Sequence, residues 1–309
     1  MNIPIVFTHF GKSNFLELAI QQAKFTNPKS AIYLLGDDAN LYLSDSCNHQ
    51  QFSKYSDCDT SFKEVYQHFS TNSYEFEYFC FKRWFVLLDF MKANHLDWIC
   101  ATDSDFMLYD NVSDFLSTIL KGNNHAAGYC VQEQDFDSFL WCASGHISFV
   151  SKDFLESFCE FVITTYSTNF SLLQRKIEYH VQNNINGGIC DMTLLYLYYI
   201  ENKNDVFNLL VPFNGVVFDN KIDYGTNFIV DEYHTKNDGF KAIEMIQGKP
   251  YVLSKKNKSI QFVGLHFQGS AKSRMCDFYT GRKSSVFFKL KYNNVKKALK
   301  SKIKKALRI

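Results

Sequence analysis

One stretch carries the clearest signal about the architecture of this 309-residue chain: DWICATDSDFM, at residues 97–107. Its first half is a short apolar run, which predicts a buried β-strand over residues 97–101. Its second half sets Asp103 and Asp105 one residue apart directly after that strand. In a parallel α/β sheet, ligands bind at the carboxyl ends of the strands. We therefore expect these two carboxylates to face a crevice, where they could hold a divalent cation that grips a diphosphate.

The segments before this stretch predict a βαβ unit. Residues 3–7 and 31–35 are short apolar runs typical of strands, and residues 15–23 carry apolar side chains at the three- and four-residue spacing of a helix. A largely buried helix is expected over residues 76–95. Strands that alternate with helices predict an α/β fold of Rossmann-like type, with a mainly parallel sheet flanked by helices. Further elements are expected at 147–150 (strand), 153–166 (helix), 191–200 (helix) and 260–265 (strand), and the order of elements over 202–258 is left open.

The composition predicts one compact domain over residues 1–280. Apolar residues make up 46% and aromatic residues 17% of the chain, which excludes intrinsic disorder. The nine cysteines include no CxxC pair, so we interpret them as reduced core residues. Cys47, His49 and Cys58 lack a fourth ligand at a zinc-site spacing. Neither a signal sequence nor an apolar segment of about 18 residues is evident, so a cytoplasmic protein is expected.

Charge is unevenly distributed along the chain. Residues 282–309 hold 11 of the 33 basic residues and no acidic one, which leaves the rest with 22 basic against 32 acidic residues. Basic residues gathered at a chain end, rather than across a folded face, argue against a nucleic-acid partner. In a tail spanning 281–309, apolar residues recur every four positions from Val295 to Leu307, so a helix there would be basic and amphipathic. We expect it to lie on an anionic membrane at the cytoplasmic face; a solubilising tail and a helix packed on a partner are the alternatives.

A second motif follows the strand expected at 260–265. His266, Gly269 and Lys272 form the pattern His-x-x-Gly-x-x-Lys. The imidazole could complete a metal site with Asp103 and Asp105, the glycine allows backbone to approach a phosphate, and the lysine offers positive charge to a departing diphosphate. The two motifs lie 161 residues apart yet are chemically complementary, so we predict that the fold brings them together.

Together these motifs resemble those of the family-8 glycosyltransferases of bacterial surface-polysaccharide type, which have the GT-A fold, use nucleotide sugars and manganese, and retain the anomeric configuration. The resemblance implies that Arg83, on the helix before the Asp-x-Asp strand, reaches the donor sugar. It places Asp191 near the reacting sugar as a catalytic residue; capping the helix that begins there is the alternative role. Residues 143–145, Ala-Ser-Gly, occupy the place of the family's Asn-x-Gly turn.

The resemblance implies a metal-dependent hexosyltransferase. Asp103, Asp105 and His266 would hold Mn²⁺, with Mg²⁺ as the other candidate, and Asp103, Gly269 and Lys272 would contact the donor. The donor would be a nucleoside diphosphate sugar, with uridine favoured, and the acceptor a glycan or a lipid-linked saccharide. The acceptor hydroxyl would attack from the side of the leaving group, with the diphosphate accepting its proton.

Two further donor contacts are expected at strand ends. Thr8 follows the first strand and Asp37 follows the second, where the base and ribose of a nucleotide lie in this type of fold. Both residue types are also common in turns.

Two other functions are the alternatives. Met192 replaces a glutamine and Ala143 an asparagine of the family pattern, which leaves room for a non-catalytic protein that binds a nucleotide sugar. A phosphatase with Asp103 as nucleophile would also use an Asp-x-Asp motif, although that motif normally lies near the N-terminus.

Overall fold

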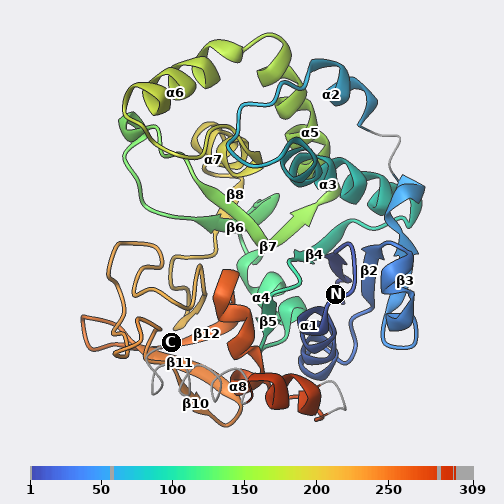
Figure 1. The fold of residues 1–309 in the computed structure, drawn as a ribbon, viewed down its shortest axis with the longest axis vertical. Helices are drawn as coiled ribbons and strands as arrows, with labels where there is room; N and C mark the ends of the chain where they lie inside the picture. Colours follow the sequence, from blue (N-terminus) through green and yellow to red (C-terminus); the bar gives the residue numbers. More distant parts are fainter. Residues whose placement is uncertain (1, 56–58, 284–286, 295, 297–309) are drawn as a thin grey trace.

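The computed structural model describes residues 2–55, 59–283, 287–294 and 296. It contains a larger sheet with strand order β3-β2-β1-β4-β7-β6-β8 and a smaller one with order β10-β11-β12-β5, in which β9 also pairs with β12 (Figure 1). The strands are β1 (Ile5–Thr8), β2 (Ile32–Gly36), β3 (Asn48–Gln51), β4 (Trp98–Thr102), β5 (Phe106–Leu108), β6 (Ala127–Val131), β7 (Ala143–Ser151), β8 (Val206–Asn208), β9 (Val216–Phe218), β10 (Glu244–Ile246), β11 (Lys249–Leu253) and β12 (Ser259–His266). The helices are α1 (Asn14–Thr26), α2 (Thr60–Val65), α3 (Tyr74–Ala93), α4 (Val112–Ile119), α5 (Lys152–Ser167), α6 (Phe170–Gln182), α7 (Asp191–Glu201) and α8 (Met275–Phe278), with short 3₁₀ turns η1 (Asp38–Leu43), η2 (Phe52–Tyr55), η3 (Phe136–Ser138) and η4 (Gly269–Arg274).

The larger sheet confirms the predicted α/β class. Strands β3, β2, β1 and β4 are parallel neighbours, with Ile5 of β1 opposite Ile32 of β2 and Cys100 of β4. Strand β7 runs antiparallel to β4 and to β6, and β8 pairs in parallel with β6. Four of the six pairings are therefore parallel, and the sheet is mainly parallel as predicted.

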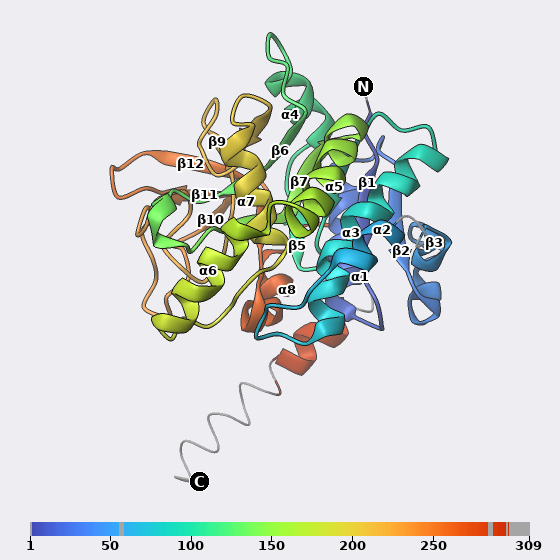
Figure 2. The same cartoon turned by 90° about the horizontal axis from the view of Figure 1, so that it is seen from above.

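The predicted helices form because their ends and buried faces are encoded locally. The hydroxyl of Ser13 accepts a hydrogen bond from the backbone N–H of Leu16 at the start of α1, and Ser73 caps α3 in the same way. Helices α3, α5 and α7 pack in one hydrophobic cluster, whereas α1, α4 and the smaller sheet share another. These two clusters cover opposite faces of the larger sheet. Figure 1 shows α3, α5 and α7 above the sheet and α1 below it, and in Figure 2, seen from above, α3, α5 and α7 lie in front of the strands. The result is a layered fold of helices, sheet and helices.

Of the smaller sheet, the sequence predicted only β12, the strand expected at 260–265. Strands β9, β10 and β11 lie in residues 202–258, whose order was left open because short apolar runs are mixed there with Asn, Asp and Gly. Strand β5 begins immediately after the Asp-x-Asp turn and pairs antiparallel with β12, so that Phe106 lies opposite His266. The three residues 103–105 thus connect the larger sheet, through β4, to the smaller one, through β5. This connection places the Asp-x-Asp turn at the junction of the two sheets.

One sequence expectation about local structure is wrong. Residues 143–145 do not form a turn; they are the first residues of β7, and Ala143 lies opposite Val131 of β6. Gly145 is required there by packing rather than by turn geometry, because a Cβ atom at this position would lie 2.5 Å from the indole ring of Trp84. Eight of the nine residues of β7 are buried, as is typical of a central strand that is covered on both faces.

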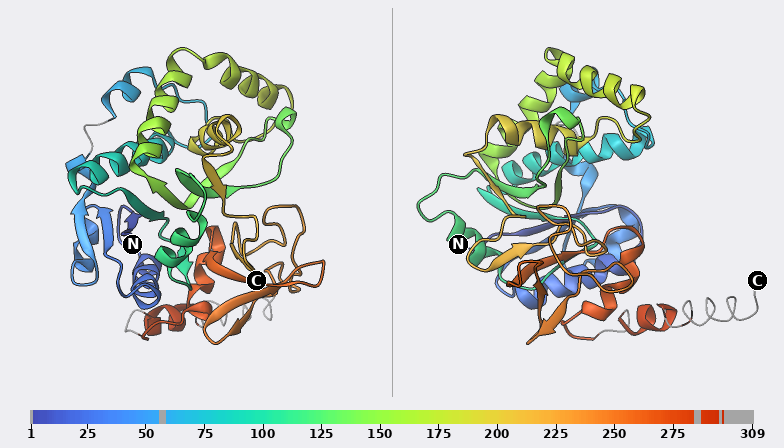
Figure 3. Two further views of the ribbon diagram at one scale, coloured as in Figure 1. Left: turned by 180° about the vertical axis from the view of Figure 1, so that it is seen from behind. Right: turned by 90° about the vertical axis from the view of Figure 1, so that its left-hand side faces the viewer.

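The segment after α8 continues along the body of the molecule. Residues 287–294 are helical (Figure 3). The buried Phe287 ring lies 5.6 Å from the ring of Tyr279. Residues 297–309, which include most of the amphipathic repeat expected in the tail, lie outside the described residues. Within the described part of the chain, no helix combines the length and apolar character that a membrane span requires.

Candidate active site

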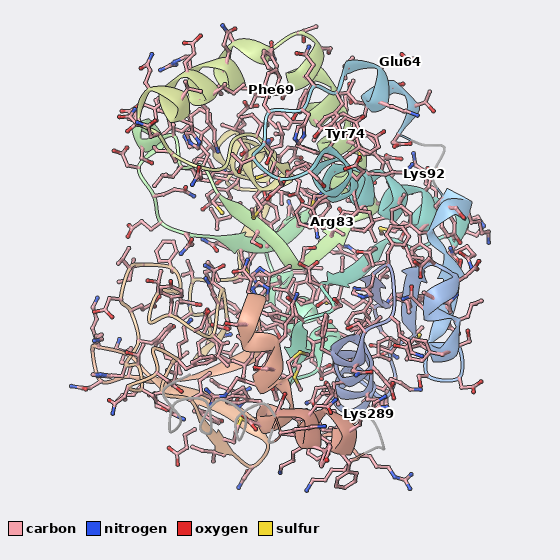
Figure 4. The ribbon with its side chains drawn as sticks, in the orientation of Figure 1. Glu64, Phe69, Tyr74, Arg83, Lys92 and Lys289 are labelled. Carbon is pink, nitrogen blue, oxygen red and sulfur yellow. The ribbon has the colours of Figure 1, made fainter. Side chains whose placement is uncertain are left out.

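A cavity of about 580 Å³ opens at the carboxyl end of β1 and β4 and extends under α3 and α7. Its volume lies in the range typical of small-molecule sites. Seven of the residues singled out in the sequence line it: Thr8, Arg83, Asp103, Asp105, Asp191, His266 and Lys272. Figure 4 labels Arg83 near the middle of the molecule, on α3 where the helix faces the sheet.

The structure brings the two sequence motifs into one cluster. Asp103, Asp105 and His266 each offer a ligand atom, and these atoms lie within 4.8 Å of one another. Strand pairing explains the contact. Phe106, the first residue of β5, lies opposite His266, the last residue of β12, so the Asp-x-Asp turn before β5 lies next to His266. The backbone N–H of Phe267 also donates a hydrogen bond of 2.9 Å to the carbonyl oxygen of Asp105.

The donor set fits a hard divalent cation. Two carboxylates and one imidazole suit Mg²⁺ or Mn²⁺, and the cluster contains no cysteine sulfur of the kind that selects softer metals. His266 is oriented for this role because its Nδ1 atom lies 2.7 Å from the carbonyl oxygen of Asn220, to which it must donate. Its Nε2 atom, 3.7 Å from an Asp105 oxygen, is then free to act as a ligand.

The imidazole of a second histidine, His146, packs against that of His266. The ring of His146 stacks on His266 with centroids 4.0 Å apart and an interplanar angle of 9°. Burial, and then the neighbouring His266, lowers the pKa of His146 well below its ordinary value, so the stacked ring stays neutral. A neutral His146 adds no positive charge to repel a cation.

Both imidazoles depend on one buried segment, residues 219–220. Asp219 accepts a hydrogen bond from the backbone N–H of His266 through Oδ2 and from Nε2 of His146 through its carbonyl oxygen. Its other carboxylate oxygen lies 2.8 Å from the ammonium of Lys241, and both side chains are fully buried. This ion pair was not foreseen, because its members lie in the stretch whose order the sequence left open.

Two cationic side chains flank the carboxylates. The ammonium of Lys272 lies 3.1 Å from Asp105 and 4.9 Å from the centre of the Phe15 ring. The guanidinium of Arg83 bridges Asp103, at 3.0 Å, and Asp191, at 2.8 Å. Burial alone would lower the pKa of Arg83, but the two carboxylates outweigh it and raise the pKa above its ordinary value. Arg83 is therefore a permanent positive charge in the middle of the cavity.

Asp191 is not the capping residue of α7. Cys190 occupies the cap position, and Asp191 is the first residue of the helix. Its Oδ2 atom accepts hydrogen bonds from Arg83 and, at 3.0 Å, from the indole N–H of Trp84. The Trp84 indole packs directly against Gly145, where a side chain would leave no room for it. Gly145 therefore contributes indirectly to the position of the Asp191 carboxylate, which the indole N–H contacts.

Of the other expected donor contacts, Thr8 lines the cavity, whereas Asp37 and Gly269 do not. Thr8 lies in the wall of the cavity beside His9, a residue that the sequence analysis did not single out although it directly follows Thr8. Asp37 lies outside the cavity lining, where its carboxylate accepts a hydrogen bond from the backbone N–H of Gly11. Gly269 has a φ of +58° and lines a neighbouring cavity, which shares Lys272 with the first.

Comparison with known proteins identifies the fold. No protein-family model matches the chain, and no curated protein matches it in sequence. The structure is similar to that of WbbM, a bifunctional glycosyltransferase, with a TM-score of 0.50 and 10% identity over 95% of this chain and 51% of WbbM, so this chain spans about half of that protein. Mouse xyloside xylosyltransferase 1 matches with a TM-score of 0.45 and 10% identity over 68% of this chain and 85% of its own. The glycosyltransferase GlyE of Streptococcus pneumoniae TIGR4 matches with a TM-score of 0.36 and 15% identity, covering 68% of this chain and 45% of GlyE. The chain thus has a Rossmann-like α/β fold of the kind found in glycosyltransferases.

Proposed function

We propose that this protein is a glycosyltransferase that moves a sugar from a nucleoside diphosphate donor to a glycan acceptor. The observation that carries the proposal is the convergence of Asp103, Asp105 and His266 within 4.8 Å, with Lys272 and Arg83 on either side. Such a cluster fits a diphosphate because it combines a cation site with a separate lysine ammonium. The fold similarity to WbbM supports the same assignment.

The residues have distinct roles in this proposal. A divalent cation on the two aspartates and His266 would supply Lewis-acid stabilisation of the diphosphate leaving group. Lys272 is placed to neutralise the negative charge that develops on the same group. Arg83 holds Asp103 and Asp191 apart in fixed positions, and Asp191 is placed to stabilise positive charge on the reacting sugar.

The finer features of the proposal come from the resemblance of the motifs to family-8 glycosyltransferases. We propose retention of anomeric configuration, Mn²⁺ as the metal with Mg²⁺ as a substitute, a uridine nucleotide, and a role in polysaccharide biosynthesis. The acceptor would be a growing glycan or a lipid-linked saccharide. Thr8, which ends β1 and lines the cavity, would contact the nucleotide.

Donor binding tests the proposal directly. We expect isothermal titration of the full chain with nucleoside diphosphate sugars to show binding of at least one donor in Mn²⁺ and at least tenfold weaker binding after chelation, because the diphosphate contacts depend on the cation. The variant Lys272→Met should bind the same donor about tenfold more weakly, since it removes one charge-assisted contact. Lys249→Met, which removes a half-exposed lysine paired with Asp110, is the matched control. Metal-independent binding, or no binding of any donor, would exclude the proposed function.

We also propose that the basic segment 281–309 holds the enzyme at the anionic cytoplasmic face of a membrane; the composition of this segment is the support for it. The expected result is co-sedimentation of the full chain with vesicles containing anionic phosphatidylglycerol, and much less with vesicles of phosphatidylcholine alone. Replacing Lys300 and Lys304 by Glu should weaken binding by at least about tenfold, because each basic residue contributes about 1 kcal/mol near such a surface. Equal binding to both vesicle types would contradict this proposal.

A further inference from the structure

Besides the metal ligands, residues of α3, α6 and α7 and of the segments beside them line the cavity, and we call this part of the lining the second compartment. Residues of the 70–80, 140–142, 176–180 and 185–192 segments line it. Its wall is built by close backbone contact, because the N–H of Ile189 donates to the carbonyl oxygen of Phe69 and Gly188 pairs with Ser70 in an isolated bridge. Gly188 has a φ of +117° and approaches Phe69 so closely that no Cβ atom fits. Residues 70–73 form the loop in this wall, and Figure 4 labels Phe69 and Tyr74, the residues directly before and after it.

Glu77 is a buried carboxyl group that lines this compartment and forms no salt bridge with a Lys or Arg of the residues that the structure describes. Its residue is 2% exposed, and its Oε1 atom accepts a hydrogen bond of 2.6 Å from the side-chain amide of Asn72. Its Oε2 atom is buried and accepts no hydrogen bond of ordinary geometry within the described part of the chain. Burial raises the pKa of this carboxyl group, and the side chains of Asn72 and Ser70 offset that rise only in part. The nearby guanidinium of Arg83 contacts Asp103 and Asp191 instead. A buried carboxyl oxygen without a donor costs stability, so this arrangement calls for a ligand.

His180 presents a second unused acceptor to the same compartment. The residue is 7% exposed, and its Nε2 atom lies 2.9 Å from the carbonyl oxygen of Phe139. A carbonyl oxygen can only accept, so in this tautomer Nε2 carries the proton and Nδ1 has the lone pair. That Nδ1 atom is also buried, with no partner in the described part of the chain.

The surroundings indicate what kind of molecule would supply the missing donors. Leu140, Trp141 and Ile185 also line this compartment, so apolar surface lies around the two polar acceptors. A pyranose sugar matches both features, because its hydroxyl groups donate hydrogen bonds while its C–H faces pack on apolar side chains. Asp191, which we propose to lie beside the donor sugar, also lines this cavity.

We propose that the second compartment binds the saccharide acceptor, with the Glu77 carboxylate and the Nδ1 atom of His180 accepting hydrogen bonds from its hydroxyl groups. This inference rests on the proposed function, and it adds specific acceptor-binding residues outside both sequence motifs. Glu77 is a specificity-determining residue in this scheme, since it selects acceptors that present a hydroxyl group at the right position. The transferred sugar would pass from the metal side of Arg83 to the acceptor on the other side.

The test uses Glu77→Gln, with Glu75→Gln as a matched control that makes the same change at an exposed position of the same helix. Binding of UDP in Mg²⁺ is measured by calorimetry, and binding of methyl glycosides of common hexoses, hexosamines and pentoses by saturation-transfer NMR with UDP and Mg²⁺ present. We expect Glu77→Gln to weaken glycoside binding by about 10- to 100-fold, the effect of losing a hydrogen bond to a charged group. UDP binding should be unchanged in both variants, and Glu75→Gln should bind glycosides like the wild type.

Thermal stability separates a binding role from a structural one. Because Glu77 is buried and forms no salt bridge with a described Lys or Arg, Glu77→Gln should melt at or above the temperature of the wild type. A lower melting temperature, or glycoside affinity within twofold of the wild type, would overturn the inference. So would a wild-type protein that binds UDP and none of the glycosides. Failure to bind UDP and every other nucleoside diphosphate, by contrast, would contradict the proposed function itself.

Discussion

Asp105→Asn is expected to lower the rate of sugar transfer by about 10³-fold. Asp105 contributes a carboxylate to the predicted cation site and also contacts Lys272 at 3.1 Å, so the substitution weakens both groups that stabilise the diphosphate. Removal of one preorganised electrostatic contact typically costs 10² to 10³ in rate, and two are affected here. The measurement is the initial rate of transfer from the best donor over a range of Mn²⁺ concentrations.

The dependence on metal concentration identifies the cause of this loss. Half-maximal activity of Asp105→Asn should require a higher concentration of Mn²⁺ than that of the wild type, because a carboxamide binds a cation more weakly than a carboxylate does. Asp153→Asn makes the same change at an exposed position in the first turn of α5 and should retain full activity. An Asp105→Asn enzyme with normal rate and normal metal dependence would show that this cluster does not hold the catalytic cation.

Arg83→Met is expected to lower the free energy of unfolding by about 3–5 kcal/mol, which is typical when one partner of a buried ion pair is removed. Asp191 has a side chain only 4% exposed, and it would lose its cationic partner. The indole N–H of Trp84 would remain as its hydrogen-bond donor. Denaturant unfolding followed by circular dichroism measures the change, and donor binding on the folded variant measures the effect on the site.

A second substitution tests the physical cause. In the double variant Arg83→Met/Asp191→Asn, neutralising the stranded carboxylate should recover a large part of the lost stability. The control is Lys92→Met, on the same helix as Arg83, which removes an exposed ion pair with Glu156 of α5. It should lower the free energy of unfolding by only about 0–1 kcal/mol. Equal destabilisation by Arg83→Met and Lys92→Met would mean that the Arg83–Asp191 pair does not organise the cavity.

The local elements of the fold could be predicted because their information lies within short segments. Ser13 and Ser73 mark helix starts, Asn27 ends α1, and the apolar run 97–101 becomes β4. A capping hydrogen bond or a run of buried side chains involves residues only a few positions apart. The local pattern failed at Gly145, where a neighbouring Trp84 ring, and not the backbone turn, explains the glycine.

The site was predicted in part. The chemistry of the Asp-x-Asp and His-x-x-Gly-x-x-Lys patterns led to the prediction of a shared metal cluster, and Asp103, Asp105 and His266 do lie together. Asp219 and Lys241 were missed, because a buried ion pair in an irregular segment has no periodic signature. Glu77 was missed for a related reason: on the sequence it is one acidic residue in the first turn of a helix, like its exposed neighbour Glu75.

Composition and local pattern alone determined the α/β class, the positions of the main helices and the residue types available for cation and diphosphate binding. Only the tertiary structure decided which of these residues meet. The antiparallel register of β5 with β12 sets His266 beside Asp105, and the packing of α3 on α7 sets Arg83 between two carboxylates. The contacts of Asp105 with His266 and of Arg83 with Asp191 join residues more than 100 positions apart. They depend on strand register and helix packing, which no local sequence pattern specifies.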